Sequence, residues 1–257
     1  MDHDPEFDRP ASKRPSRRRS WPDQGCLAVG LVLIWVLGAY SVHVRGVVRE
    51  GARRAQCVNC LKQIAVALHE YEERHGTLPP ANTVDATGRP LHSWRTLILP
   101  FLEEEELYRR IDLNRPWDDP SNAAVAESMP HVYACPSGLV PPPQLPPGRT
   151  TYLAAVGPDA CSLPGRGRSR AEITSDPAAT LLVIEANPSD AVPWMAPSDA
   201  DAAWLGRFDP ANGSPHAKGR NVARLDGYVE SLKATTPPAL VRELTSISRP
   251  RESNPTR

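Results

Sequence analysis

The chain has few aromatic residues and no excess of charge of either sign. Only three of its 257 residues are Phe, whereas 29 are Pro, which predicts a loop-rich soluble region with modest regular structure. The formal net charge is zero, so no basic surplus points to a nucleic-acid partner. The sequence also lacks a phosphate-binding loop, a dinucleotide fingerprint and a Gly-x-Ser-x-Gly nucleophile elbow. We therefore expect no catalytic and no cofactor-binding residues.

Charged residues are also missing from a long apolar segment near the N-terminus. Residues 26–44 contain no Asp, Glu, Lys or Arg. As a helix rising about 1.5 Å per residue they would cover roughly 28 Å, close to the hydrocarbon thickness of a bilayer. A buried core helix seldom lacks charge on every face for this length. A cleaved signal has a shorter apolar core of about 7–15 residues, followed by a small-residue cleavage site. We expect an uncleaved transmembrane helix over residues 25–44.

The basic residues on either side of this segment predict its orientation. Residues 13–19, before the segment, contain five of them and no acid, whereas Glu50 lies among the four Arg residues that follow. Because cytoplasmic flanks carry the excess of Lys and Arg, the N-terminus is expected inside. The predicted organisation is a disordered basic cytoplasmic tail over 1–24, the span over 25–44, an extracytoplasmic domain over 45–245 and a disordered tail over 246–257. We expect a single-pass protein of the inner (cytoplasmic) membrane.

The segment after the span continues as an amphipathic helix. Its apolar residues recur at steps of three and four, which places them on one stripe: Val58, Leu61, Ile64, Ala65, Leu68 and Tyr71. Gly76 then favours a helix end, and Pro79 and Pro80 prevent its continuation. The pattern predicts one helix from Gly25 to His75, half in lipid and half packed on the soluble domain.

Farther along the chain, shorter elements are expected. Ser93 is a candidate N-cap for a helical region to Ile111, which Pro100 should kink or divide. The four consecutive residues 103–106 are all Glu, and they are expected to be solvated. Apolar runs and the Asp226-Gly227 turn predict strands at 131–135, 152–156 and 180–185 and a hairpin of 221–225 with 228–232.

Several motifs, in one order along the chain, carry a resemblance to a known family. They are 52–57, 59–64, 67–71 and 75–80, then 93–95, 99–103, 117–118, 135–137, 180–185 and 192–194 with Pro197 and Asp199, and last His216 with 221–222 and 226–229. In this order they resemble the domain of unknown function 1559 family, the prepilin-like proteins of planctomycete-type bacteria. The resemblance covers roughly residues 45–232. It implies an α+β, pseudopilin-like fold, in which the second half of a long N-terminal helix lies against a small antiparallel sheet.

The N-terminal leader departs from the pattern of that family. Members usually carry a Gly-Phe-Thr-Leu-x-Glu type processing site, but the apolar segment here contains neither Phe-Thr-Leu nor an acidic residue. We therefore expect a permanently anchored relative. The alternative is a component of a type II secretion or type IV pilus-like filament, which would require processing and extraction from the membrane.

The sequence allows several roles for the cysteines. Cys57 and Cys60 have the Cys-x-x-Cys spacing, and Cys135 and Cys161 could complete four zinc ligands. The second pair is not closely spaced and the first lies in a predicted helix, so we expect no metal site. Two interpretations stay open. Either Cys57 or Cys60 bonds to Cys135 or Cys161, joining the helix to the sheet or loops, or all four are inert buried thiols.

Two other groups of polar residues are candidates for a functional site, one catalytic and one for calcium. His216 and Asp226 could serve a hydrolase together with a serine, but a loop histidine that bonds to the backbone is the expected role of His216. Asp199, Asp201 and Asp226 could bind calcium by analogy with major pseudopilins, although their spacing is irregular. We predict a non-enzymatic envelope protein, with the lipid bilayer and other envelope proteins or copies of itself as partners. The alternatives are the filament component and an envelope hydrolase.

Overall fold

The computed structural model describes residues 24–136, 145–209, 216 and 219–248. Residues 1–23 of the predicted tail (1–24) and the end of the chain from residue 249 lie outside this part, and Gln24 is the first residue of α1. By their internal contacts the residues form two compact units, residues 1–48 and residues 49–257, and each is described by itself.

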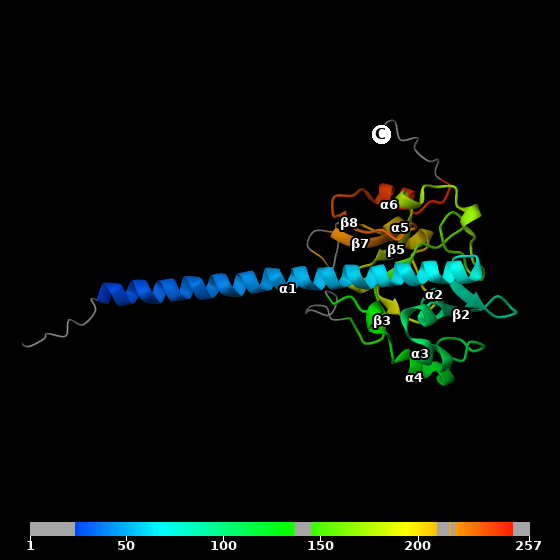
Figure 1. Ribbon diagram of the computed structural model, residues 1–257, viewed down its shortest axis with the longest axis horizontal. Helices are drawn as coiled ribbons and strands as arrows, with labels where there is room; N and C mark the ends of the chain where they lie inside the picture. Colours follow the sequence, from blue (N-terminus) through cyan, green and yellow to red (C-terminus); the bar gives the residue numbers. More distant parts are fainter. Residues whose placement is uncertain (1–23, 137–144, 210–215, 217–218, 249–257) are drawn as a thin grey trace, which may run out of the picture. The chain divides into compact units, whose positions relative to one another are not determined.

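Helices and strands follow the chain in an α+β order (Figure 1). The α-helices are α1 (Gln24–His75), α2 (Trp94–Leu97), α3 (Glu105–Arg109), α4 (Ala123–Ala126), α5 (Ala202–Arg207) and α6 (Pro238–Leu244). The strands are β1 (Asn82–Val84), β2 (Pro90–Ser93), β3 (Arg149–Thr150), β4 (Tyr152–Ala154), β5 (Leu181–Glu185), β6 (Val192–Pro193), β7 (Gly219–Arg224) and β8 (Val229–Lys233). Short 3-10 helices connect them, among them η1 (Leu99–Leu102) and η3 (His131–Tyr133).

In the first unit, α1 presents apolar side chains to its surroundings. Side chains such as Leu31, Ile34 and Trp35 are two-thirds or more exposed, at 68%, 68% and 73%. An 18-residue window of this helix has a mean hydropathy of 1.7, so α1 is long and apolar enough to cross a membrane. Exposed apolar area of this extent is unfavourable in water.

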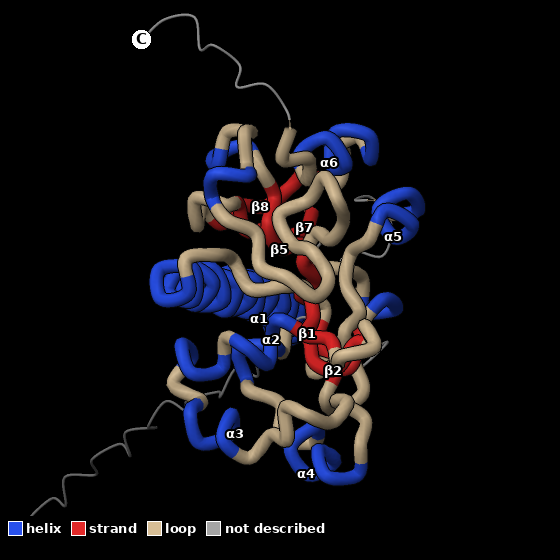
Figure 2. Tube along the Cα trace, turned by 90° about the vertical axis from the view of Figure 1, so that its right-hand side faces the viewer, coloured by secondary structure: helices blue, strands red, loops and turns tan. Residues whose placement is uncertain are grey.

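In the second unit, the rest of α1 lies against a four-stranded antiparallel sheet of order β4-β5-β7-β8. The predicted stripe is the contact surface, since Leu61, Ile64 and Leu68 are buried in one core with residues of the sheet such as Val183. The opposite face of the sheet buries a second core against α5 and α6, which includes Trp204 and Val241. The sheet therefore lies between α1 and the pair α5 and α6 (Figures 1 and 2).

The helix end and the hairpin follow the sequence prediction. Gly76 has a φ of +77°, which suits a glycine after the last helical residue, His75. β7 and β8 pair antiparallel around Asp226-Gly227, and Gly227 also has a positive φ, of +85°. Ser93 caps α2 by accepting from the Arg95 N–H, and Pro100 lies in η1, which separates α2 from α3.

Two sequence predictions are wrong in detail. Residues 131–135 were expected as a strand, but His131–Tyr133 form a 3-10 helix, and Tyr133 faces the core with its hydroxyl on the Arg95 carbonyl. Residues 246–248, expected in a disordered tail, belong to the domain. Ile247 is buried and accepts backbone bonds from Thr174 and Ser175. One apolar residue inside a polar tail was too weak a signal to place this contact.

Candidate functional site

A row of polar side chains crosses the sheet on the face that meets α1. Tyr152 of β4 lies opposite Glu185 of β5, and Asn221 of β7 lies opposite Ser231 of β8. The Asn221 N–H joins the two halves of the row by donating to Glu185 Oε2 at 3.2 Å. Ser231 Oγ donates to Asn221 Oδ1 at 3.1 Å. Because side chains alternate between the two faces of a strand, Glu185 shares the α1 face with Val183, two residues earlier.

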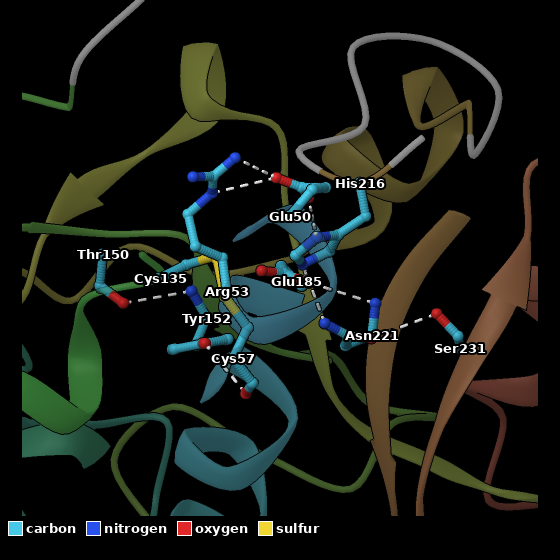
Figure 3. The surroundings of a disulfide bond; sticks show 10 residues. All are labelled: Glu50, Arg53, Cys57, Cys135, Thr150, Tyr152, Glu185, His216, Asn221 and Ser231. Carbon is cyan, nitrogen blue, oxygen red and sulfur yellow. Dashed lines mark hydrogen bonds and ion pairs between the residues drawn. A yellow bond between two sulfur atoms is a disulfide. The ribbon is translucent and has the colours of Figure 1, made fainter. Parts of the chain in front are cut away.

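A disulfide between Cys57 and Cys135 lies beside this row (Figure 3). Cys57 comes from α1 and Cys135 from the loop after η3, and their Cα atoms are 5.2 Å apart. Both residues are fully buried. The Tyr152 hydroxyl donates to the Cys57 carbonyl at 3.3 Å, so the sheet also contacts the backbone of α1 at this point. The disulfide is one of the four pairings that the sequence left open.

His216, three residues before the start of β7, lies between two carboxylates. Its Nδ1 is 3.3 Å from Glu50 Oε1, and its Nε2 is 3.3 Å from Glu185 Oε2. The Asn221 amide nitrogen lies 3.0 Å from the same Nε2. Glu50 belongs to α1, and the Arg53 guanidinium holds its other oxygen through two bonds of 3.0 and 2.7 Å.

These contacts set the protonation of the site. Burial alone would lower the pKa of His216, but hydrogen bonds to and attraction by Glu185 and Glu50 outweigh it and raise that pKa above the ordinary value of 6.5. Burial would raise the pKa of Glu50, but the bonds from Arg53 and His216 outweigh it, so that pKa is lowered. Burial raises the pKa of the Tyr152 phenol well above 10. The tyrosine is therefore a neutral hydrogen-bond donor.

Four side chains of this region converge closely enough to hold a metal ion. One possible ligand atom from each of Cys57, Cys135, Glu185 and His216 lies within 4.8 Å of every other, and all four residues are buried. Glu185 Oε2 is engaged by Asn221, whereas Glu185 Oε1 is buried and has no hydrogen-bond partner among the described residues. Figure 3 shows the Glu185 carboxylate between the disulfide and His216.

The other candidate residues lie in different surroundings. Cys60 and Cys161 are buried free thiols. The described partners of the His216 ring nitrogens are the side chains of Glu50 and Asn221, whereas the sequence predicted a bond to the backbone. The three aspartates considered for calcium have separate roles. Asp199 pairs with Arg95, Asp201 caps α5, and Asp226 accepts from the Tyr228 N–H in the hairpin turn.

Sequence reasoning did not bring Glu185 or Glu50 to this site. Glu185 ends the segment 180–185, which the sequence predicts as a buried strand and of which 181–185 form β5. A carboxylate in such a strand requires a buried polar partner. The presence of Glu185 in this strand therefore indicated a polar site on the sheet. The partner itself could not be named, since His216 is 31 residues away and Glu50 lies in α1, six residues after the apolar segment that ends at Val44.

Comparison with known protein families matches residues 47–182, more than half of the 257 residues, to the family described as "Protein of unknown function (DUF1559)". The matched region includes Glu50, Cys57 and Cys135 and ends three residues before Glu185. No curated protein and no solved structure matches the chain. The matched residues confirm the resemblance that the motifs predicted, and the chain belongs to the DUF1559 family.

Proposed function

We propose that the protein is a single-pass anchor of the inner (cytoplasmic) membrane whose pseudopilin-like domain faces away from the cytoplasm and has a structural or protein-interaction role. The observation that carries this proposal is the buried Cys57–Cys135 disulfide, 13 residues beyond the end of the apolar segment at Val44. Structural disulfides persist outside the cytoplasm, where thiol reductants do not keep cysteines reduced. The excess of basic residues before the span supports the same orientation.

The contacts around His216 support a non-enzymatic role. A hydrolase that used this histidine as its base would need a nucleophile at its ring. Among the described residues, the nearby hydroxyl of Ser231 donates to Asn221. The ring instead bonds to Glu50 of α1, and its other nitrogen faces Glu185 of the sheet. Such contacts hold the helix on the domain. A screen of ester and peptide substrates comparing the native protein with His216→Ala would contradict this role if it found an activity that the substitution removes.

Membrane topology is the decisive test. Ala86 is exposed on the domain, so Ala86→Cys offers a reporter thiol, and Ser16→Cys offers one before the span. We expect a membrane-impermeant maleimide to label Ala86→Cys once the outer layers of the envelope are opened. Ser16→Cys should be labelled only after the inner membrane is broken. The reverse pattern would overturn the proposed orientation.

Filament assembly remains the alternative role. It would require the N-terminus to be processed before the helix leaves the membrane, whereas a permanent anchor keeps residues 1–24. Mass spectrometry of the protein isolated from membranes would distinguish the two. An N-terminal peptide starting at Met1 or Asp2 supports the anchor, and a new N-terminus close to Gly25 supports the filament component.

A further inference from the structure

The disulfide site has the composition of a metal site as well as that of a cross-link. We propose that, when the Cys57–Cys135 disulfide is reduced, the two cysteines bind one Zn²⁺ together with Glu185 and His216. The bond that joins α1 to the domain would then have two forms, a disulfide in the oxidised protein and a zinc site in the reduced protein. This inference concerns the chemistry of the site and holds for either orientation in the membrane.

The first argument is the set of ligands. Two thiolates, an imidazole and a carboxylate are all groups that bind zinc, and four ligands complete its usual tetrahedron. Zinc distances of about 2.0 to 2.3 Å place the ligand atoms of a tetrahedral site roughly 3.3 to 3.8 Å apart. The possible ligand atoms here all lie within 4.8 Å of one another, and His216 Nε2 is already 3.3 Å from Glu185 Oε2. Only small movements of side chains are needed.

The second argument is the unsatisfied oxygen of Glu185. Glu185 is fully buried, and its Oε1 has no hydrogen-bond partner among the described residues. A buried carboxylate oxygen without a partner costs free energy, and a cation beside it would supply the missing interaction. Oε2 accepts from the Asn221 N–H, so this bond orients the carboxylate and leaves Oε1 to contact the cation.

The third argument is the support behind His216. A histidine that binds zinc through one ring nitrogen usually donates from the other to a carboxylate or a carbonyl. His216 has this arrangement, since Nδ1 lies 3.3 Å from Glu50 Oε1 and Arg53 holds the opposite oxygen of Glu50. With the proton on Nδ1, Nε2 carries the lone pair, which can turn from Asn221 to the metal.

Electrons and protons balance in the conversion between the disulfide form and the zinc form. Reduction transfers two electrons and two protons from a dithiol reductant to the disulfide, and the reductant becomes a disulfide in turn. The two sulfur atoms, no longer bonded, separate to van der Waals contact, which is close to their spacing in a zinc site. Zinc binding then releases both thiol protons to solvent, because the ligands are thiolates. Oxidation by a disulfide oxidant reforms the Cys57–Cys135 bond and releases the ion.

The test uses the full chain in detergent. The protein is prepared oxidised, or reduced with a phosphine and freed of metal, and Zn²⁺ is titrated in competition with a chromophoric chelator. We expect one Zn²⁺ per reduced chain and none per oxidised chain. In the reduced protein, His216→Ala and Glu185→Gln should each weaken binding at least tenfold. Co²⁺ in place of Zn²⁺ should show the thiolate charge-transfer bands of a tetrahedral site.

Cys60→Ser is the matched control, because Cys60 is a buried thiol of the same helix, three residues from Cys57, and it should leave zinc affinity unchanged. The His216 and Glu185 variants retain both cysteines of the bond, so circular dichroism of their oxidised forms checks that they fold. The proposal is overturned if the reduced native chain binds no zinc or if oxidised and reduced chains bind it equally. Loss of binding in Cys60→Ser but not in His216→Ala would also overturn it. The topology labelling is unaffected by any of these outcomes.

Discussion

The Arg95 guanidinium donates to Asp199 Oδ1 at 2.6 Å, and the two side chains are only 0% and 4% exposed. Arg95 also donates through Nε and Nη2 to the Tyr152 carbonyl, at 3.0 and 2.9 Å. Asp199 Oδ1 accepts in addition from the indole of Trp94 and the N–H of Ala154, at 3.0 and 2.9 Å. The pair therefore ties α2 to β4 and to the loop before α5.

Removing one charge of this pair should destabilise the domain strongly. Arg95→Met leaves the Asp199 carboxylate buried without its cation, and such losses cost about 3–5 kcal/mol. Asp199→Asn keeps an acceptor for Trp94 and Ala154 but leaves the Arg95 cation buried. We expect the double variant to be more stable than the sum of the two single losses implies, as measured by urea unfolding. Simple additivity would show that the two charges do not act as a pair.

The Cys57–Cys135 disulfide should contribute to stability through the unfolded chain. It closes a sequence separation of 78 residues, for which the loss of loop entropy corresponds to roughly 4.5 kcal/mol. We expect the free energy of unfolding of Cys57→Ser, in metal-free buffer, to fall by about this amount. Cys60→Ser, which removes a nearby thiol outside the bond, should lose far less. Equal losses in the two variants would assign the effect to packing.

The free thiols of the domain should resist alkylation in the native state. Burial raises the pKa of Cys161 to about 12, and burial with the charge of Glu185 raises the pKa of Cys60. Thiolate is the reactive form, so at pH 8 both should be nearly inert. The fifth cysteine, Cys26 at the start of the apolar segment, is replaced by serine for this test. Mass spectrometry should then find neither thiol modified by iodoacetamide before urea is added and both modified afterwards. Rapid labelling without urea would contradict their burial.

Gly219 at the start of β7 should not tolerate a side chain. Its φ is +134°, and a Cβ atom there would lie 1.8 Å from the carbonyl oxygen of Leu232 in β8. We expect Gly219→Ala to lower the free energy of unfolding by about 1–3 kcal/mol, because the strands must part or the backbone must shift. Gly206→Ala in α5 is the control. A Cβ there meets nothing within 4 Å, and alanine favours a helix by up to about 1 kcal/mol, so stability should hold or rise.

Asp159 should make the C-terminal segment sensitive to acid. Its carboxylate accepts from the hydroxyls of Ser246 and Ser248, both at 2.6 Å, and these bonds lower its pKa below the ordinary 3.8. A lowered pKa adds stability that is present above pH 3.8 and is lost as the pH falls through the folded-state value. Nuclear magnetic resonance should show Asp159 titrating below 3.8. In Asp159→Asn, the chemical shifts of Ser246 and Ser248 should no longer change over this pH range. If they still change, another acid causes the transition.

The main elements of the fold could be read from local patterns. Nineteen consecutive residues without Asp, Glu, Lys or Arg predicted the apolar half of α1. The stripe containing Leu61, Ile64 and Leu68 predicted its packing face, and Asp226-Gly227 predicted the hairpin. These signals suffice because helix periodicity, charge depletion and turn chemistry act between residues close in the chain. The resemblance to the family could be recognised for the same reason, because its motifs are short local sequences that follow one another in one order along the chain.

The candidate site depends on contacts between residues far apart in the sequence. Glu50, Cys57, Cys135, Glu185 and His216 come from four regions of the chain, and no spacing among them resembles a metal or catalytic motif. The strand pairing sets Glu185 beside Asn221, and the packing of α1 on that face brings Cys57 and Glu50 over it. Local sequence thus sufficed for the helix, its apolar segment and the hairpin. The partner of Cys57 and the surroundings of His216 arise only when the sheet and the helix pack together, because that packing brings distant side chains within bonding distance.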